Sequence, residues 1–188
     1  MALKLSIDAN IFLNVKNKEK PYYGYSKKIL ELIDQGKAEG VVSTLVIAEL
    51  CAGYHEFNEL AEKDEFLAQL ATNPDYKIVN LDLKVADEAG RIRAATHLRL
   101  PDAILVASSL VAEAKILVTH DDQLTKAQDV IRVLTAEQAL KELQVIETDE
   151  DIFFKPKKST VDLAGSGAEH ANPKEMKKPL DRLRQEDV

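Results

Sequence analysis

Three carboxylates each stand alone in an apolar stretch of this 188-residue sequence: Asp8, Glu49 and Asp102. Placing a carboxylate among apolar side chains costs free energy unless a cation, hydrogen bonds or water receive its charge. For Glu49, the positions one helical turn away carry apolar or small residues, so no basic neighbour pairs with it along its own helix. A bound metal ion would offset the cost. The structural alternative is an exposed glutamate on a narrow polar stripe.

The other two lone carboxylates have structural explanations when each is considered by itself. Asp8 directly follows a strand predicted for residues 4–7, and aspartate at such a place commonly caps a helix. Asp102 follows Pro101 at the start of a predicted helix, where proline and a negative charge are both favourable. Their meaning therefore depends on whether the fold brings them together.

A fourth acidic position follows the apolar segment 115–119, where the sequence continues His120-Asp121-Asp122. We expect one of the two aspartates to cap the short helix that follows and the other to face a cleft. For His120, a capping or exposed position is the simplest interpretation. The four histidines of the chain show no zinc-binding spacing.

Strand and helix patterns alternate along residues 1–146, which we expect to form one domain. Strands are predicted over residues 4–7, 40–43, 76–81, 115–119 and 130–134, and helices over 26–35, 45–54, 56–71, 84–97, 101–114, 122–126 and 135–143. This alternation implies an α/β fold with a parallel sheet covered by helices on both faces. Ligands of such sheets bind outside the carboxyl ends of the strands.

The predicted topology brings the four carboxylates toward one cleft. Asp8 and Asp121 both follow strands and should lie at the same edge of the sheet, Asp102 begins the helix before the later strand, and Glu49 follows the second strand closely. Four converging carboxylates repel one another, and hard divalent cations with oxygen ligands relieve that repulsion. Mg²⁺ or Mn²⁺ fits such a site better than zinc does.

Composition narrows the class of protein. The net charge of −7 argues against coating nucleic acid by bulk charge, but not against a nuclease. The single cysteine, Cys51, excludes a disulfide within the chain, and we expect it to be a buried, inert thiol. No apolar run approaches the roughly 20 residues of a membrane span, and no signal peptide is evident, so we expect a cytoplasmic protein.

Residues 147–188 differ in composition from the rest of the chain. They are rich in charges, contain three of the six prolines and include the segment Ala164-Gly-Ser-Gly-Ala168. We expect this tail to be largely disordered, with residues 152–154 and 180–183 as segments that dock on the domain or on a partner.

In four ordered motifs the chain resembles the PIN domain family, and within it the VapC-type toxins of toxin–antitoxin pairs. The motifs are Asp8-Ala-Asn10, the helix Ser43-Thr-Leu-Val-Ile-Ala-Glu49, Leu100-Pro-Asp-Ala-Ile104, and Val118-Thr-His-Asp121. The resemblance implies a five-stranded parallel sheet in three α/β/α layers, often in a homodimer. It also implies Mg²⁺- or Mn²⁺-dependent cleavage of RNA, with an antitoxin protein as a possible partner. It further implies that Asp8, Glu49, Asp102 and Asp121 hold the metal while Asn10 and Thr119 orient ligands and water; the motif spacing selects Asp121 over Asp122.

RNA would reach such a site past basic and aromatic side chains. The candidates are Lys16, Lys18, Lys20, Arg91, Arg93 and Arg99 for phosphates, and Tyr22, Tyr23 and Tyr25 for stacking on bases, against the alternatives of solvated charge and ordinary packing. Replacing the three lysines together with alanine is predicted to weaken RNA binding. Two other functions remain open. The first is a non-catalytic module that binds RNA or a partner. The second is a phosphohydrolase, which Asn10 disfavours because phosphatases with an aspartate nucleophile usually show Asp-x-Asp after the first strand, and here the second position of that motif is Asn10.

Overall fold

The computed structural model describes residues 3–143, which contain a five-stranded sheet. Its strands are β1 (Leu3–Ile7), β2 (Ala38–Ser43), β3 (Tyr76–Val79), β4 (Ile116–Val118) and β5 (Arg132–Leu134). Every neighbouring pair is parallel, and the strand order is β3-β2-β1-β4-β5. The predicted five-stranded parallel sheet is confirmed.

Helices connect the strands and begin or end at residues that the sequence marks. They are α1 (Ala9–Lys16), α2 (Tyr23–Asp34), α3 (Thr44–Glu56), α4 (Leu60–Thr72), α5 (Leu83–Thr96), α6 (Leu100–Val111), the 3-10 helix η1 (Asp122–Ala127) and α7 (Ala136–Glu142). Thr135 caps α7 as predicted, with a reciprocal hydrogen bond to Gln138. Gly36, just after α2, has φ +67°, a conformation that glycine adopts without strain. α1 is an element that the sequence patterns did not predict.

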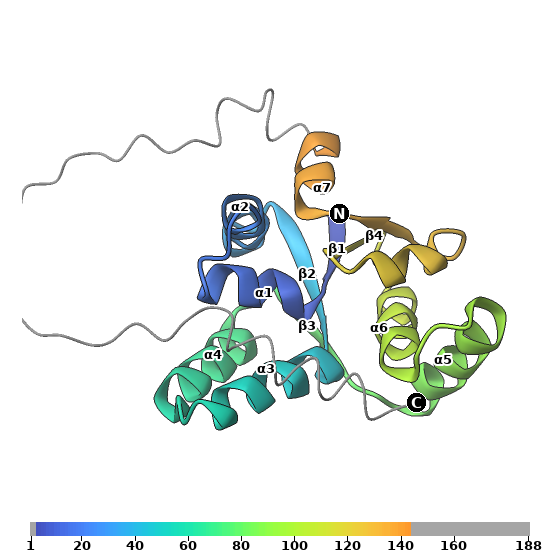
Figure 1. Cartoon of the computed structure of the whole chain (residues 1–188), viewed down its shortest axis with the longest axis horizontal. Coiled ribbons are helices and arrows are strands. Elements are labelled where there is room, and N and C mark those ends of the chain that lie inside the picture. The colour runs from blue at the N-terminus through green and yellow to red at the C-terminus, as the bar shows by residue number, and fades with distance from the viewer. Residues whose placement is uncertain (1–2, 144–188) are drawn as a thin grey trace, which may run out of the picture.

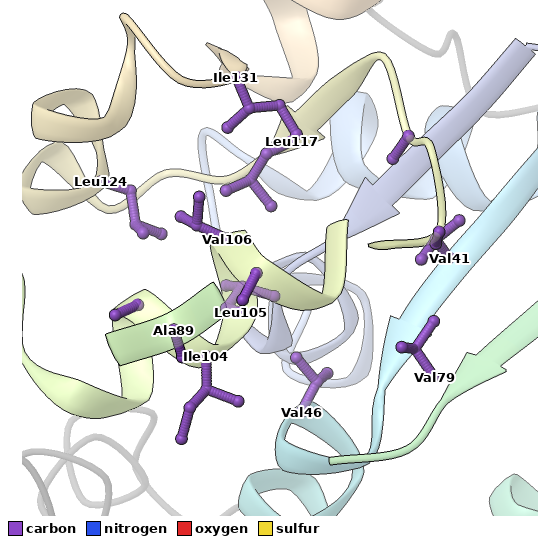
Figure 2. Close-up of a cluster of buried hydrophobic side chains, with 14 of the residues drawn as sticks. Val41, Val46, Val79, Ala89, Ile104, Leu105, Val106, Leu117, Leu124 and Ile131 are labelled. Atoms are coloured by element: carbon purple, nitrogen blue, oxygen red, sulfur yellow. The ribbon is translucent and has the colours of Figure 1, made fainter. Parts of the chain in front are cut away.

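Two apolar cores lie on the two faces of the sheet, giving the expected three-layer α/β/α arrangement. One core joins Ile29 and Ile33 of α2 and Leu140 of α7 to the strands. The other joins α3, α5 and α6 to the opposite face, and Figure 2 shows its side chains from α6 and the strands interleaving. Figure 1 shows α2 and α6 on opposite sides of the strands. The sheet therefore presents only its edges and strand ends for a site.

The order in which the chain adds strands to the sheet reverses at the central strand β1. The connections from β1 lead outward through β2 to β3, whereas β4 and β5 lie on the other side of β1. The carboxyl ends of β1 and β4 therefore flank a topological switch point, where open parallel sheets bind ligands. Ile7 pairs with Val118 in register, so Asp8 and Thr119 leave the sheet side by side.

The structure bears differently on the expectations for Cys51, for the tail and for membrane spans. Cys51, expected to be buried, is partly exposed on α3, because the helix turns this side chain toward the surface. The boundary near residue 146 and the tail segments 152–154 and 180–183 lie outside the described residues. None of the described helices combines the length and the hydropathy needed to cross a membrane.

Candidate active site

Asp8 is a buried carboxylate held by neutral hydrogen-bond donors at the end of β1. It is 2% exposed. Its Oδ1 accepts a hydrogen bond from the backbone N–H of Ala9 at 2.7 Å, so the residue caps α1. Its Oδ2 accepts one hydrogen bond from Asn10 Nδ2 and one from the Thr119 hydroxyl, each at 2.6 Å. Capping is thus combined with a fixed side-chain orientation.

Thr119 and Asn10 link the ends of β1 and β4 through side chains. Besides donating to Asp8, the Thr119 hydroxyl accepts from Asn10 Nδ2 at 3.0 Å and from the backbone N–H of Asp121 at 2.9 Å. The carbonyl of Asn10 accepts from the backbone N–H of His120 at 3.2 Å. The loop after β4 is therefore locked to the start of α1 by side chains more than 100 residues away in sequence.

Asp121 belongs to this network and also caps η1. Its Oδ1 accepts from the backbone N–H of Gln123 at 2.9 Å, whereas Asp122 is exposed in the first turn of η1. The capping role thus falls to Asp121, the residue predicted to be functional. The two roles are compatible, because a carboxylate has two oxygens and capping engages one of them.

Two buried serine pairs tie α6, which carries Asp102, to the elements that carry the other carboxylates. The hydroxyls of Ser109 and Ser6 are 2.7 Å apart, and Ser6 precedes Asp8 by two residues. The hydroxyls of Ser108 and Ser43 are 3.0 Å apart, and Ser43 caps α3, the helix of Glu49. The sequence interpretation missed these four serines. Their signal was available, since each sits in an otherwise apolar stretch.

Asp102 lies in the first turn of α6 and contacts an arginine. Pro101 occupies the first turn with it, as predicted from the sequence. Nε of Arg99 donates to Asp102 Oδ2 at 3.2 Å, and Asp102 is almost completely buried. Glu49 is half-buried on α3. Among residues 3–143, no group of three or more acidic, histidine or cysteine side chains is arranged to hold a metal ion.

The structure places the predicted RNA-contacting residues in different environments. Lys16 pairs with Glu59 and lies over the Tyr54 ring at 4.4 Å, and Arg91 pairs with Glu88 on α5. Tyr22, by contrast, is exposed and packs against the His120 ring at a centroid distance of 4.4 Å, beside the network.

His120 packs beside this network in surroundings that disfavour the charged form of its ring. Burial lowers the pKa of its imidazole, although nearby Glu19 opposes the shift. Its Nε2 lies 3.5 Å from the Ser26 hydroxyl. The ring thus packs against Tyr22 and Ser26 beside the hydrogen-bond network.

A separate apolar groove has a volume of about 570 Å³, and none of the four predicted metal-binding carboxylates lines it. α1 to α4 and β3 line it with Phe12, Leu50, Tyr54, Phe66 and Tyr76, and Lys16 and Asp34 also line it. Burial and the neighbouring Asp34 raise the pKa of Tyr76, and burial raises the pKa of Asp34.

Comparison with known proteins agrees with the observed fold. A toxin–antitoxin complex from Klebsiella pneumoniae has a chain 19% identical to this one, with TM-score 0.55, covering 70% of this chain and 97% of its own. VapBC2 from Rickettsia felis, bound to a DNA fragment from its promoter, gives 18% identity and TM-score 0.54, covering 71% and 98%. FitAcB from Neisseria gonorrhoeae gives 17% identity and TM-score 0.54 over the same shares.

At these identities the three structures speak for the fold alone. A comparison with curated protein sequences finds no match. The family model described as "PIN domain" matches residues 5–130, which is more than half of the chain and spans all four carboxylates. The chain belongs to the PIN domain family.

Proposed function

We propose that this protein is a metal-dependent endoribonuclease that hydrolyses RNA phosphodiester bonds, and that it acts as the toxin of a toxin–antitoxin pair. The observation that carries the proposal is the buried Asp8 carboxylate, fixed by Asn10 and Thr119 at the switch point of a PIN fold, with the backbone N–H of Asp121 bound to the same Thr119 hydroxyl. Stability alone does not require so polar a network at a strand end. A site for chemistry does, because it needs oriented charge.

The ligands of the proposed Mg²⁺ or Mn²⁺ are Asp8, Glu49, Asp102 and Asp121. Their chemistry fits, since carboxylate oxygens are hard donors and two of the four are buried, where a cation would offset their charge. When bound, the metal supplies acidified water at neutral pH and neutralises charge on the leaving oxygen. Thr119 and Asn10 keep the Asp8 oxygens in one orientation.

The test is cleavage of a mixed RNA pool by the full-length chain with Mn²⁺, comparing wild type with Asp102→Asn and adding a chelator lane. We expect cleavage by wild type and none in the other two lanes, because each removes part of the metal site. The matched control is Asp122→Asn, which removes one exposed carboxylate next to the network and should cleave like wild type. Cleavage that survives in Asp102→Asn would exclude this site as its source.

A toxin role adds a growth phenotype to the biochemical one. Expression of the wild-type chain should arrest growth of a bacterial host, whereas the Asp8→Asn form should not. Equal growth of the two strains would refute toxicity. Nuclease activity would then be decided by the RNA cleavage assay alone. In this role we place the protein in the cytoplasm as a homodimer with an antitoxin partner.

The apolar groove favours a second candidate function, a non-catalytic module that binds a protein partner. The rings of Phe12, Tyr54 and Phe66 line a cavity of about 570 Å³, large enough for several side chains of a partner helix or strand. Calorimetry separates the two candidates. A chain that binds neither Mn²⁺ nor Mg²⁺ but still binds a partner through this groove would be a module and not an enzyme.

A further inference from the structure

Arg99 stands at the place where the buried carboxylate of Asp102 meets solvent. It is the N-cap residue of α6, three positions before Asp102, and its backbone is extended (φ −63°, ψ 155°). The backbone N–H of Ala103 donates to its carbonyl at 2.9 Å, which fixes the Arg99 backbone at the helix start. Its side chain is 35% exposed, whereas that of Asp102 is 10% exposed. The Arg99 side chain therefore reaches both the nearly buried Asp102 carboxylate and the solvent.

The guanidinium supplies the positive charge that this nearly buried carboxylate needs. Nε of Arg99 donates to Asp102 Oδ2 at 3.2 Å. A divalent cation would bring the same kind of charge to the same carboxylate, so arginine and metal compete for it.

We propose that Arg99 is an internal counter-ion that pairs with Asp102 while metal is absent and moves to a phosphate of the RNA backbone once metal is bound. The inference rests on the proposed metal-dependent ribonuclease function and adds a positioning residue to it. A guanidinium suits both roles, because its planar donors match carboxylate and phosphate alike. The side chain thereby opposes metal binding and assists RNA binding.

The two roles predict opposite effects of one substitution. In Arg99→Gln, Mn²⁺ binding measured by calorimetry should tighten about threefold to tenfold, as expected for removing a partly exposed competing ion pair. At saturating Mn²⁺, the same variant should cleave RNA with a raised KM, because the phosphate loses its cation. A residue that merely supports the fold would not tighten metal binding when it is replaced.

Arg91→Gln is the matched control for charge. Arg91 pairs with Glu88 on the exposed surface of α5, so its loss changes the net charge equally but leaves Asp102 untouched. Its affinity for Mn²⁺ should equal that of wild type. Arg99→Lys keeps the charge and should also stay near the wild-type Mn²⁺ affinity, while its point charge should bind RNA less well than a guanidinium.

A second measurement covers the case in which Arg99→Gln does not fold. In ¹⁵N NMR spectra of the wild-type chain, the Arg99 Nε–H signal should shift during a Mg²⁺ titration, whereas that of Arg91 should not. A stationary Arg99 signal with bound Mg²⁺, or a folded Arg99→Gln with unchanged or weaker Mn²⁺ affinity, overturns the counter-ion role and leaves the nuclease standing. Absence of Mn²⁺ binding in both wild type and Arg99→Gln overturns the metal site and this inference together.

Discussion

At the carboxyl end of β1, the carboxylate of Asp8 accepts three hydrogen bonds from neutral groups, whereas at the start of α6 the carboxylate of Asp102 accepts one from the guanidinium of Arg99. The first arrangement fixes the oxygens with a backbone amide and two short side chains. The second brings a charge on a long, partly exposed side chain that can move away.

This difference separates two ways of stabilising a buried carboxylate. Neutral donors orient the group and leave its negative charge in place, ready for a cation. A guanidinium neutralises the charge and must be displaced before a cation can take its place. In the proposed metal site, the Asp8 side would therefore be organised before metal arrives, and the Asp102 side would exchange one cation for another.

The largest effect that tests this comparison comes from replacing each aspartate with asparagine. Both Asp8→Asn and Asp102→Asn should abolish RNA cleavage. Their stabilities should differ, because an asparagine at position 8 turns an amide NH₂ toward donors that need an acceptor. We expect urea unfolding of the metal-free proteins to show a loss of about 1–3 kcal/mol for Asp8→Asn.

For Asp102→Asn the loss should stay below about 1 kcal/mol, since Arg99 can turn to water. Equal losses in the two variants would mean that the neutral network and the ion pair stabilise the fold alike. The comparison between the two sides would then fail, whatever the RNA assay shows.

A smaller but more specific effect is expected when the Asp8 side is given a second charge. Asn10→Asp would put a carboxylate where Asn10 Nδ2 now lies, 2.6 Å from Asp8 Oδ2. The metal-free protein should lose about 2 kcal/mol or more of unfolding free energy through repulsion between like charges. Added Mg²⁺ should restore much of it, because the cation would bind between the two carboxylates.

Asn73→Asp is the control for that substitution. Asn73 Nδ2 also donates to an aspartate, Asp34, at 3.2 Å, but on the exposed surface. Its replacement should cost little, and Mg²⁺ should not change the cost. A Mg²⁺ effect of equal size in the two variants would point to general charge screening in place of a site.

Much of this architecture could be predicted from local patterns. The alternation of strands and helices gave the sheet, and lone carboxylates in apolar stretches marked Asp8, Glu49 and Asp102. These signals are local, because burial imposes a period and leaves few charges in a buried segment. Helix α1 escaped prediction since its eight residues are too few for a clear period, and only its cap at Asp8 announced it.

The contacts that join the elements carrying the carboxylates could not be predicted in the same way. The pair of Ser109 with Ser6 spans 103 positions, and its partners meet only because α6 packs against the sheet in one register. The placement of Lys16 against Glu59, instead of near the site, likewise depends on how α1 packs beside the loop before α4. Such contacts follow from tertiary packing, which a single sequence does not display.

The smallest expected effect concerns Thr119, whose hydroxyl is shared by Asp8, Asn10 and Asp121. Thr119→Val keeps the shape but removes this hydroxyl, so the unfolding free energy should fall by about 1 kcal/mol. RNA cleavage should fall roughly 10- to 100-fold, as for other residues that orient metal ligands. Thr119→Ser keeps the hydroxyl and should retain most of the cleavage. If the valine variant cleaved RNA as well as the serine variant, the Thr119 hydroxyl would not be what orients Asp8.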